Sequence, residues 1–165
     1  MPIVLLRIDD RLIHGQITTM WVGLAAANRI VIASDEVAGD LLQRTIVGIT
    51  APPQTPTLIM TTAEAVQTAK SGAWDHQRIF VICKYPSDAL ALVKGGIGIA
   101  AINVGNIGGM KQHITGAGKQ ISQSVAVTPD DVTVLKEILA AGVKMEIRLT
   151  PRDRVEDVAA LLAKL

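Results

Sequence analysis

Apolar runs alternate along the chain with segments in which apolar residues recur at helical spacing. The apolar runs predict strands at residues 3–8, 29–33, 57–61, 78–83, 100–104 and 143–149, and a shorter run, SVAV, predicts one near 124–127. The segments between them predict helices at 14–27, 36–49, 62–72, 86–95, 129–141 and 153–164. The strands are continuously apolar rather than alternating, which is typical of parallel strands covered on both faces. The pattern predicts a three-layer α/β/α sandwich with a mostly parallel sheet of six to seven strands.

Several boundaries of these elements have their own signals. Thr61 or Thr62 can cap the third helix, with Glu64 in its first turn. The stretch TPDD (128–131) places a capping threonine, a proline and two acids at the start of the fifth helix. Gly142 follows that helix where a C-terminal glycine is expected.

Composition narrows the classes of function. The chain has 165 residues, about the size of one domain, so we expect a single domain over residues 1–165. Its net charge of +1 and its 2% aromatic content disfavour nucleic acid as a partner. No apolar run approaches the ~18 residues of a membrane span. The single cysteine, Cys83, excludes an intrachain disulfide and ends an apolar run, so we expect it in the core.

One polar stretch, RIDDRLIHGQ, stands where the first strand should end. Its charged or titratable side chains are Arg7, Asp9, Asp10, Arg11 and His14. The stretch occupies a strand end, a loop and a helix start, which is the usual place for ligands in an open α/β sheet. Gly15 would let a partner approach closely, and Gln16 adds one more hydrogen-bond donor.

A histidine at this place has the properties of a nucleophile. The start of a helix disfavours a positive imidazolium and favours an incoming anion. If His14 takes up a phosphoryl group, the turn amides and the guanidinium of Arg11 or Arg7 can hold the oxygens. Asp9 or Asp10 can accept the other ring N–H and so select the tautomer. The sequence leaves the choice between these two acids open.

Other interpretations of the chain fit its spacing less well. The charges of the stretch can simply solvate a loop. A response-regulator receiver needs an aspartate after the third strand, where MTTAEA has none, and an RHG-type phosphatase needs arginine directly before the histidine. NVGNIGG (103–109) and GAGKQ (116–120) lack the spacing of dinucleotide and P-loop motifs, and we expect the second to be a mobile loop. The histidines at 14, 76 and 113 lack the spacing of a metal motif, so we expect neither a metal nor a cofactor. We expect His76 in an exposed connection, and His113 either in a solvated loop or flanking the site.

RIDDRLIHGQ closely resembles the signature RID-x-RLIHGQ of the IIB subunit of mannose-type sugar phosphotransferase systems. The segments IFVICKYPSDALALVKGG, INVGN, GKQIS, VAV and AGVKMEIR resemble later parts of that family in the right order, so the likeness covers nearly the whole chain. GN, GKQIS and VAV are more similar to the N-acetylgalactosamine and galactosamine branch than to the mannose branch. The resemblance implies a mostly parallel sheet of strand order 3-2-4-1-5-6.

The resemblance also implies a function and partners. His14 would accept a phosphoryl group, through Nδ1, from a phosphohistidine of a separate IIA protein and pass it to a sugar held by membrane subunits IIC and IID. Arg11 would bind the phosphoryl group, Asp9 and Arg7 would shape the loop, and Lys84 would lie nearby. The protein would then be a cytoplasmic sugar phosphotransferase component, peripherally associated with the permease.

Two questions stay open from the sequence. The basic residues Arg7, Arg11 and Lys84 are expected to suit acidic partners, but neither the sugar nor a homo-oligomeric state follows from the residues. The alternative function is a non-catalytic module of the same fold that binds a small ligand or regulates, in which His14 is never phosphorylated.

Overall fold

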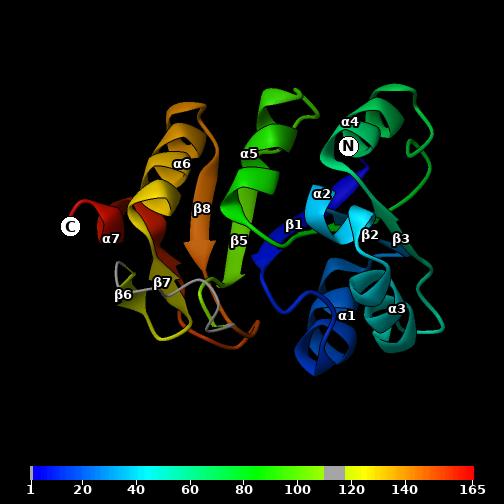
Figure 1. Ribbon diagram of the computed structural model, residues 1–165, viewed down its shortest axis with the longest axis horizontal. Coiled ribbons are helices and arrows are strands. Elements are labelled where there is room, and N and C mark those ends of the chain that lie inside the picture. The colour runs from blue at the N-terminus through cyan, green and yellow to red at the C-terminus, as the bar shows by residue number, and fades with distance from the viewer. Residues whose placement is uncertain (1, 110–117) are drawn as a thin grey trace.

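A mostly parallel sheet forms the centre of the computed structural model, which describes residues 2–109 and 118–165 (Figure 1). In spatial order its strands are β3 (Thr57–Met60), β2 (Arg29–Ala33), β4 (Ile79–Cys83), β1 (Ile3–Asp9), β5 (Ala101–Asn106), β8 (Lys144–Ile147) and β9 (Glu156–Asp157). All neighbours pair in parallel except β8 and β9. The predicted order 3-2-4-1-5-6 is confirmed, with β8 in the sixth place.

Helices cover both faces of the sheet, which confirms the three-layer architecture. One face packs against α4 (Thr62–Lys70), α5 (Pro86–Lys94), α6 (Pro129–Ala140) and α7 (Val158–Leu162). The other packs against the π-helical segment η1 (Ile17–Trp21), α2 (Asp35–Gly39) and α3 (Leu41–Thr50), with α1 (Val22–Ala25) continuing η1. Figure 1 shows α4, α5 and α6 on one side of the strands and α1 and α3 on the other. Each face therefore has its own apolar core, and β4, between them, is buried over its whole length.

The capping signals in the sequence are confirmed. Thr61 and Glu64 form a capping box at α4, and Thr128 and Asp131 form one at α6. Gly142 follows α6 with φ +84°, a conformation that glycine adopts at little cost. These local contacts fix where α4 and α6 begin and where α6 ends.

Three elements differ from the prediction. The helix expected at 36–49 is divided into α2 and α3, because Asp40 Oδ1 accepts the amides of Leu42 and Gln43 at 2.9 and 3.1 Å and starts a new helix. The helix expected at 153–164 begins instead with β9, which pairs with β8. The strand expected near 124–127 is β7 (Val125–Val127), but it pairs antiparallel with β6 (Lys119–Ser122), so part of the expected GAGKQ loop is a strand in a separate two-stranded sheet.

The first helix also departs from its expected regular form. Helical residues run from 15 to 25, and the π-helical turn lies over Ile17–Trp21. The hydroxyls of Thr18 and Thr19 both donate to the Gly15 carbonyl, at 3.1 and 2.7 Å. Over the described ranges 2–109 and 118–165, no helix has the length and apolarity that crossing a bilayer requires.

Candidate functional site

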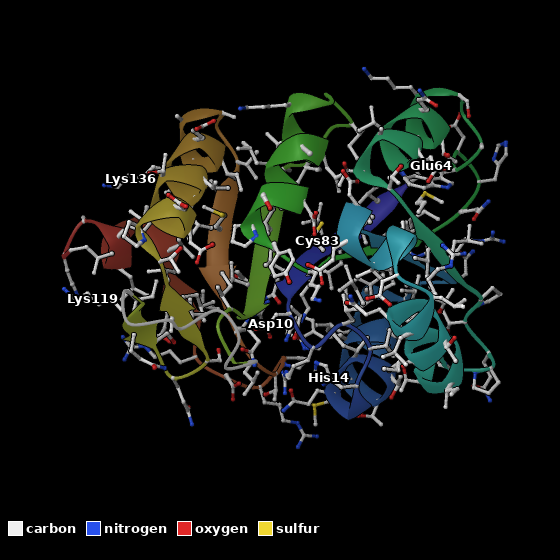
Figure 2. The ribbon with its side chains drawn as sticks, in the orientation of Figure 1. Asp10, His14, Glu64, Cys83, Lys119 and Lys136 are labelled. Carbon is white, nitrogen blue, oxygen red and sulfur yellow. The ribbon has the colours of Figure 1, made fainter. Side chains whose placement is uncertain are left out.

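The polar stretch of residues 7–16 lies at the carboxyl ends of the parallel strands, as predicted. β1 ends at Asp9, which is in register with Asn106 at the end of β5, and Asp10 donates its amide to the Asn106 carbonyl at 3.2 Å. Figure 2 shows Asp10 and His14 together at this end of the sheet, with His14 beside the first helix. The strands thus hold the start of the loop, and the helix holds its end.

The loop between Asp9 and His14 is held by two buried aliphatic side chains. Leu12 has φ +58°, an unfavourable region for a residue with a side chain, and donates its amide to the Asp9 carbonyl at 3.0 Å. Such a conformation costs on the order of 1–3 kcal/mol. Leu12 and Ile13 are both buried in the core of the α1–α3 face, and this burial offsets the strain. The apolar residues inside the motif therefore fix the loop that presents His14.

Asp9 is the centre of the site. Its side chain is fully buried and its Oδ2 lies 2.9 Å from His14 Nε2. The same oxygen accepts hydrogen bonds from Nε and Nη2 of Arg7 at 3.1 and 2.9 Å. Its Oδ1 accepts the backbone amide and Nε of Arg11 at 3.1 and 3.3 Å. Asp9 is one of the two acids that the sequence left open, and its carboxylate contacts the histidine ring.

The electrostatics of Asp9 follow from these contacts. Burial raises the pKa of its carboxyl group, but the hydrogen bond with His14 and the electrostatic attraction of Arg7, His14 and Arg11 lower the pKa by more, so the net shift is downward. Burial also disfavours the charged form of Arg7 and so lowers the pKa of its guanidinium, while the adjacent Asp9 carboxylate opposes that shift. Asp9 therefore stays ionised in spite of its complete burial.

Arg7 lies beneath the site and does not reach its surface. Its side chain is 0% exposed. Besides Asp9, its guanidinium donates to Asn103 Oδ1 and to the backbone carbonyls of Arg148 and Leu149, the last two at 3.0 and 3.1 Å. The expectation that Arg7 binds phosphate or a partner is not met, because its guanidinium donates its hydrogen bonds to groups inside the protein. The geometry supports the other role expected of it, shaping the loop.

Two further residues, which sequence reasoning did not single out as part of the site, surround the Arg7 guanidinium. A Cβ on Gly105 would overlap the guanidinium, and Gly105 is the extra residue where the β1–β5 register shifts. On another side lies the Trp21 ring, whose centroid is 4.8 Å from Arg7 Cζ and 5.5 Å from Arg148 Cζ. The Trp21 Nε1 donates to the Leu149 carbonyl at 3.1 Å. Trp21 fits the apolar stripe of the first helix, so periodicity gave no sign of this contact.

Arg11 and Gln16 form the outer part of the site. Arg11 Nη2 donates to Gln16 Oε1 at 3.3 Å, and the Arg11 side chain is still 31% exposed. Gly15 is exposed, and a Cβ there would meet nothing within 4 Å. The amides of Ile17 and Thr18 both bond to the His14 carbonyl, which removes them from the amides available to an anion. Arg11 therefore shares the Asp9 carboxylate with the His14 ring and remains partly accessible.

Lys84 is held by its own neighbours. Its Nζ lies 2.5 Å from Glu36 Oε1 and 2.6 Å from Gln43 Oε1, and the Tyr85 hydroxyl donates to Glu36 Oε2 at 2.8 Å. Burial lowers the pKa of Lys84, but its hydrogen bond with Glu36 contributes to a larger upward shift, so the amine stays protonated. Lys84 and Asp10 both line a hollow beside the loop, together with Arg11.

The remaining candidates lie away from the site or outside the described residues. His76 is exposed, as expected, and His113 lies outside the described residues. Cys83 is buried, and burial raises the pKa of its thiol well above the ordinary value, which fits a core residue. Within residues 2–109 and 118–165, His, Cys, Asp and Glu side chains form no group of three or more that could hold a metal ion.

Known proteins match this chain over nearly all of its length. The model of the family described as PTS system sorbose subfamily IIB component matches residues 3–165. The chain is 36% identical over 160 residues to the N-acetylgalactosamine-specific phosphotransferase enzyme IIB component 2 of Escherichia coli strain K12, covering 97% of this chain and 98% of that protein. It is 32% identical over 165 residues to the mannose-specific EIIAB component of the same strain, which corresponds to 100% of this chain and 50% of that protein.

A solved structure agrees with these sequence matches. The crystal structure of the IIBSor domain of the sorbose permease from Klebsiella pneumoniae superposes with a TM-score of 0.90 at 32% identity. The match covers 99% of this chain and 98% of that domain. The likeness in fold therefore extends over nearly the whole chain.

Proposed function

This chain belongs to the sorbose subfamily of phosphotransferase-system IIB components, and from this membership we propose that His14 is its phosphoryl carrier. A IIB component takes part in phosphoryl transfer, and here the group would arrive from a phosphohistidine of a IIA protein. It would leave to a sugar held by the membrane subunits IIC and IID. The matching relative named EIIAB supports IIA as the donor.

The contact between Asp9 Oδ2 and His14 Nε2, at 2.9 Å, is the observation that carries this proposal. An ionised carboxylate can only accept a hydrogen bond, so Nε2 bears the proton and Nδ1 bears the lone pair. Nδ1 is then the nucleophile. As the bond from phosphorus to the donor nitrogen breaks, that electron pair returns to the donor ring, and the Nδ1 lone pair forms the new N–P bond.

The charges around the ring suit this step. A phosphorylated ring that keeps its Nε2 proton is cationic, and the buried Asp9 carboxylate stabilises it. The phosphoryl oxygens would lie toward Arg11, whose guanidinium is fixed between Asp9 and Gln16 and remains partly exposed. Such transfer needs positioning and charge neutralisation more than covalent help. Loss of one donor of this kind costs about 10²–10³-fold in rate.

Intact-mass measurement after incubation with phosphoenolpyruvate, the general phosphotransferase proteins and a IIA protein tests the proposal. We expect the chain to gain one acid-labile phosphoryl group, and His14→Ala to gain none while it still unfolds in one cooperative transition. Arg11→Ala should still be labelled, but about 10²–10³-fold more slowly. Labelling of His14→Ala would refute the proposal, and an unlabelled parent chain would favour a non-catalytic module.

The sugar is a separate matter. The matching proteins are named for N-acetylgalactosamine, mannose and sorbose at 36%, 32% and 32% identity. Because these identities are so similar, we propose that the membrane subunits select the sugar and that this chain works as a cytoplasmic carrier at their surface.

A further inference from the structure

A hollow of about 190 Å³ lies directly beside the loop that presents His14. Its walls are the loop residues 10–13, one face of α3, and the side chains of Lys84 and Tyr85. Leu12, Ile13 and Val47 form an apolar floor that belongs to the core of this face. At the rim stands Ile46, which is 51% exposed. The hollow is thus an apolar depression with polar groups on one side.

The apolar surface continues outward from the hollow along α3. Residues 43, 46, 47 and 50 of the helix line the hollow, and the large apolar residues Leu42, Ile46 and Ile49 are exposed at spacings of four and three on the neighbouring face. Ile46 belongs to both sets, so it joins the hollow to the exposed row. An extended apolar surface of this kind marks a contact with another protein rather than an enclosed small-molecule site.

We propose that this hollow receives an apolar side chain of the IIA protein that phosphorylates His14. This inference rests on the function proposed above. An interface of standard size covers roughly 800 Å² on each partner, or a patch of about 16 Å radius. Residues 10–13 lie within four residues of His14, so their Cα atoms are at most about 15 Å from it. A protein centred on His14 therefore reaches the loop side of the hollow.

The charges nearby explain why the contact would be apolar. Each of the three basic residues near the loop already pairs with a carboxylate of this chain: Arg7 and Arg11 with Asp9, and Lys84 with Glu36. An acidic partner would have to compete with these pairs, whereas an apolar side chain only displaces water from Leu12, Ile13 and Ile46. This departs from the expectation that basic residues attract the partner. The EIIAB relative favours a IIA protein as the occupant.

Ile46→Asp and Val155→Asp form a matched pair for the test. Both side chains are 51% exposed, but Val155 lies next to β9, at the edge of the sheet opposite β3. The initial rate of transfer is measured against the concentration of phosphorylated IIA protein. We expect Ile46→Asp to raise KM about 30-fold, the size of a central interface residue, with little change in kcat. Val155→Asp should stay within about twofold of the parent.

A small phosphoryl donor separates docking from chemistry. Phosphoramidate needs no protein interface, so both variants should be labelled on His14 at the parental rate, and matching urea curves would show that both fold. An unchanged KM for Ile46→Asp overturns the inference, as does a defect seen only in transfer to the membrane subunits or only in self-association. Failure of the parent chain to accept a phosphoryl group from IIA would instead overturn the proposed function.

Discussion

Asparagine at position 9 would keep the shape of the central side chain and remove its charge. Asp9 accepts hydrogen bonds through both oxygens, from Arg11 at Oδ1 and from Arg7 and His14 at Oδ2. If the amide nitrogen takes the place of Oδ1, it opposes the Arg11 donors. If it takes the place of Oδ2, it opposes Arg7 and donates to His14 Nε2, which moves the ring proton to Nδ1. In either orientation of its side-chain amide, Asp9→Asn therefore places an N–H donor against the N–H donors of Arg7 or Arg11.

The expected size of both effects follows from burial. Arg7 is fully buried, and removing the carboxylate that pairs with such a charge costs about 3–5 kcal/mol of the free energy of unfolding. A ring held in the wrong tautomer has no lone pair on the reactive nitrogen, and a comparable exchange in a serine-protease triad costs ~10⁴-fold in kcat. Because one orientation of the amide preserves the tautomer, we expect transfer to slow by about 10²–10⁴-fold.

The pH dependence of stability provides a second signature. The pKa of Asp9 is below its ordinary value of 3.8 in the folded protein, so its stabilisation is fully present above that value and is lost as the pH falls through the folded pKa. Asp9→Asn lacks this group. The difference in unfolding free energy between parent and variant should therefore narrow in acid.

Three measurements decide the outcome: urea unfolding at several pH values, the transfer rate from phosphorylated IIA protein, and the ¹⁵N NMR shifts of the His14 ring. Asp10→Asn is the control for the ring tautomer and not for the transfer rate, because Asp9 contacts the ring and Asp10 lines the hollow proposed to receive the IIA protein. Parental transfer and an unchanged tautomer in Asp9→Asn would refute the reasoning. A tautomer change in Asp10→Asn alone would assign the role to the other acid.

Two further substitutions test the support around the site. Arg7→Met should lower the free energy of unfolding by about 3–5 kcal/mol in urea titrations, because it leaves the buried Asp9 carboxylate without its main cation, and acid unfolding should begin at a higher pH. Thr128→Ala removes the capping side chain of α6 and should cost about 1 kcal/mol in the same titration, with transfer unchanged.

For each of these two substitutions, one outcome would contradict the prediction. Arg7→Met with parental stability would mean that Asp9 finds enough compensation from Arg11 and His14 alone. A slower transfer rate in Thr128→Ala would mean that the α6 face of the sheet is coupled to the site, which its position over the opposite core does not predict.

Local sequence signals predicted the parts of the fold that depend on neighbours in the chain. The caps at Thr61 and Thr128 are satisfied within three residues, so the sequence identified Thr128 and narrowed the other cap to Thr61 or Thr62. The strand runs were equally clear, because buried parallel strands must be apolar on both faces. The division of the helix at Asp40 was missed: its apolar periodicity runs on through the break, and only the bonds of Asp40 to Leu42 and Gln43 stop it.

Sequence alone pointed to the stretch that forms the candidate site and to His14 as its candidate reactive residue, but it left open which of Asp9 and Asp10 contacts the ring. A charged stretch with one histidine, placed between a strand and a helix, indicates an anion-handling loop, and its likeness to a family signature pointed to phosphoryl transfer. The sequence also implied that Arg11, Gly15 and Gln16 lie close to His14 in space, because neighbours along a short loop cannot be far apart.

Only the tertiary structure decided what each charge does. Arg7 and Arg11 are both arginines beside the same aspartate, yet one is fully buried against Asn103, Gly105 and Trp21 and the other is 31% exposed. The partners that bury Arg7 come from β5, from the first helix and from the segment after β8. They meet only because the sheet places β1 beside β5 and β5 beside β8. Contacts between residues so distant in the chain leave no local pattern, and they are what makes Arg7 a support for Asp9 and leaves Arg11 as the accessible cation.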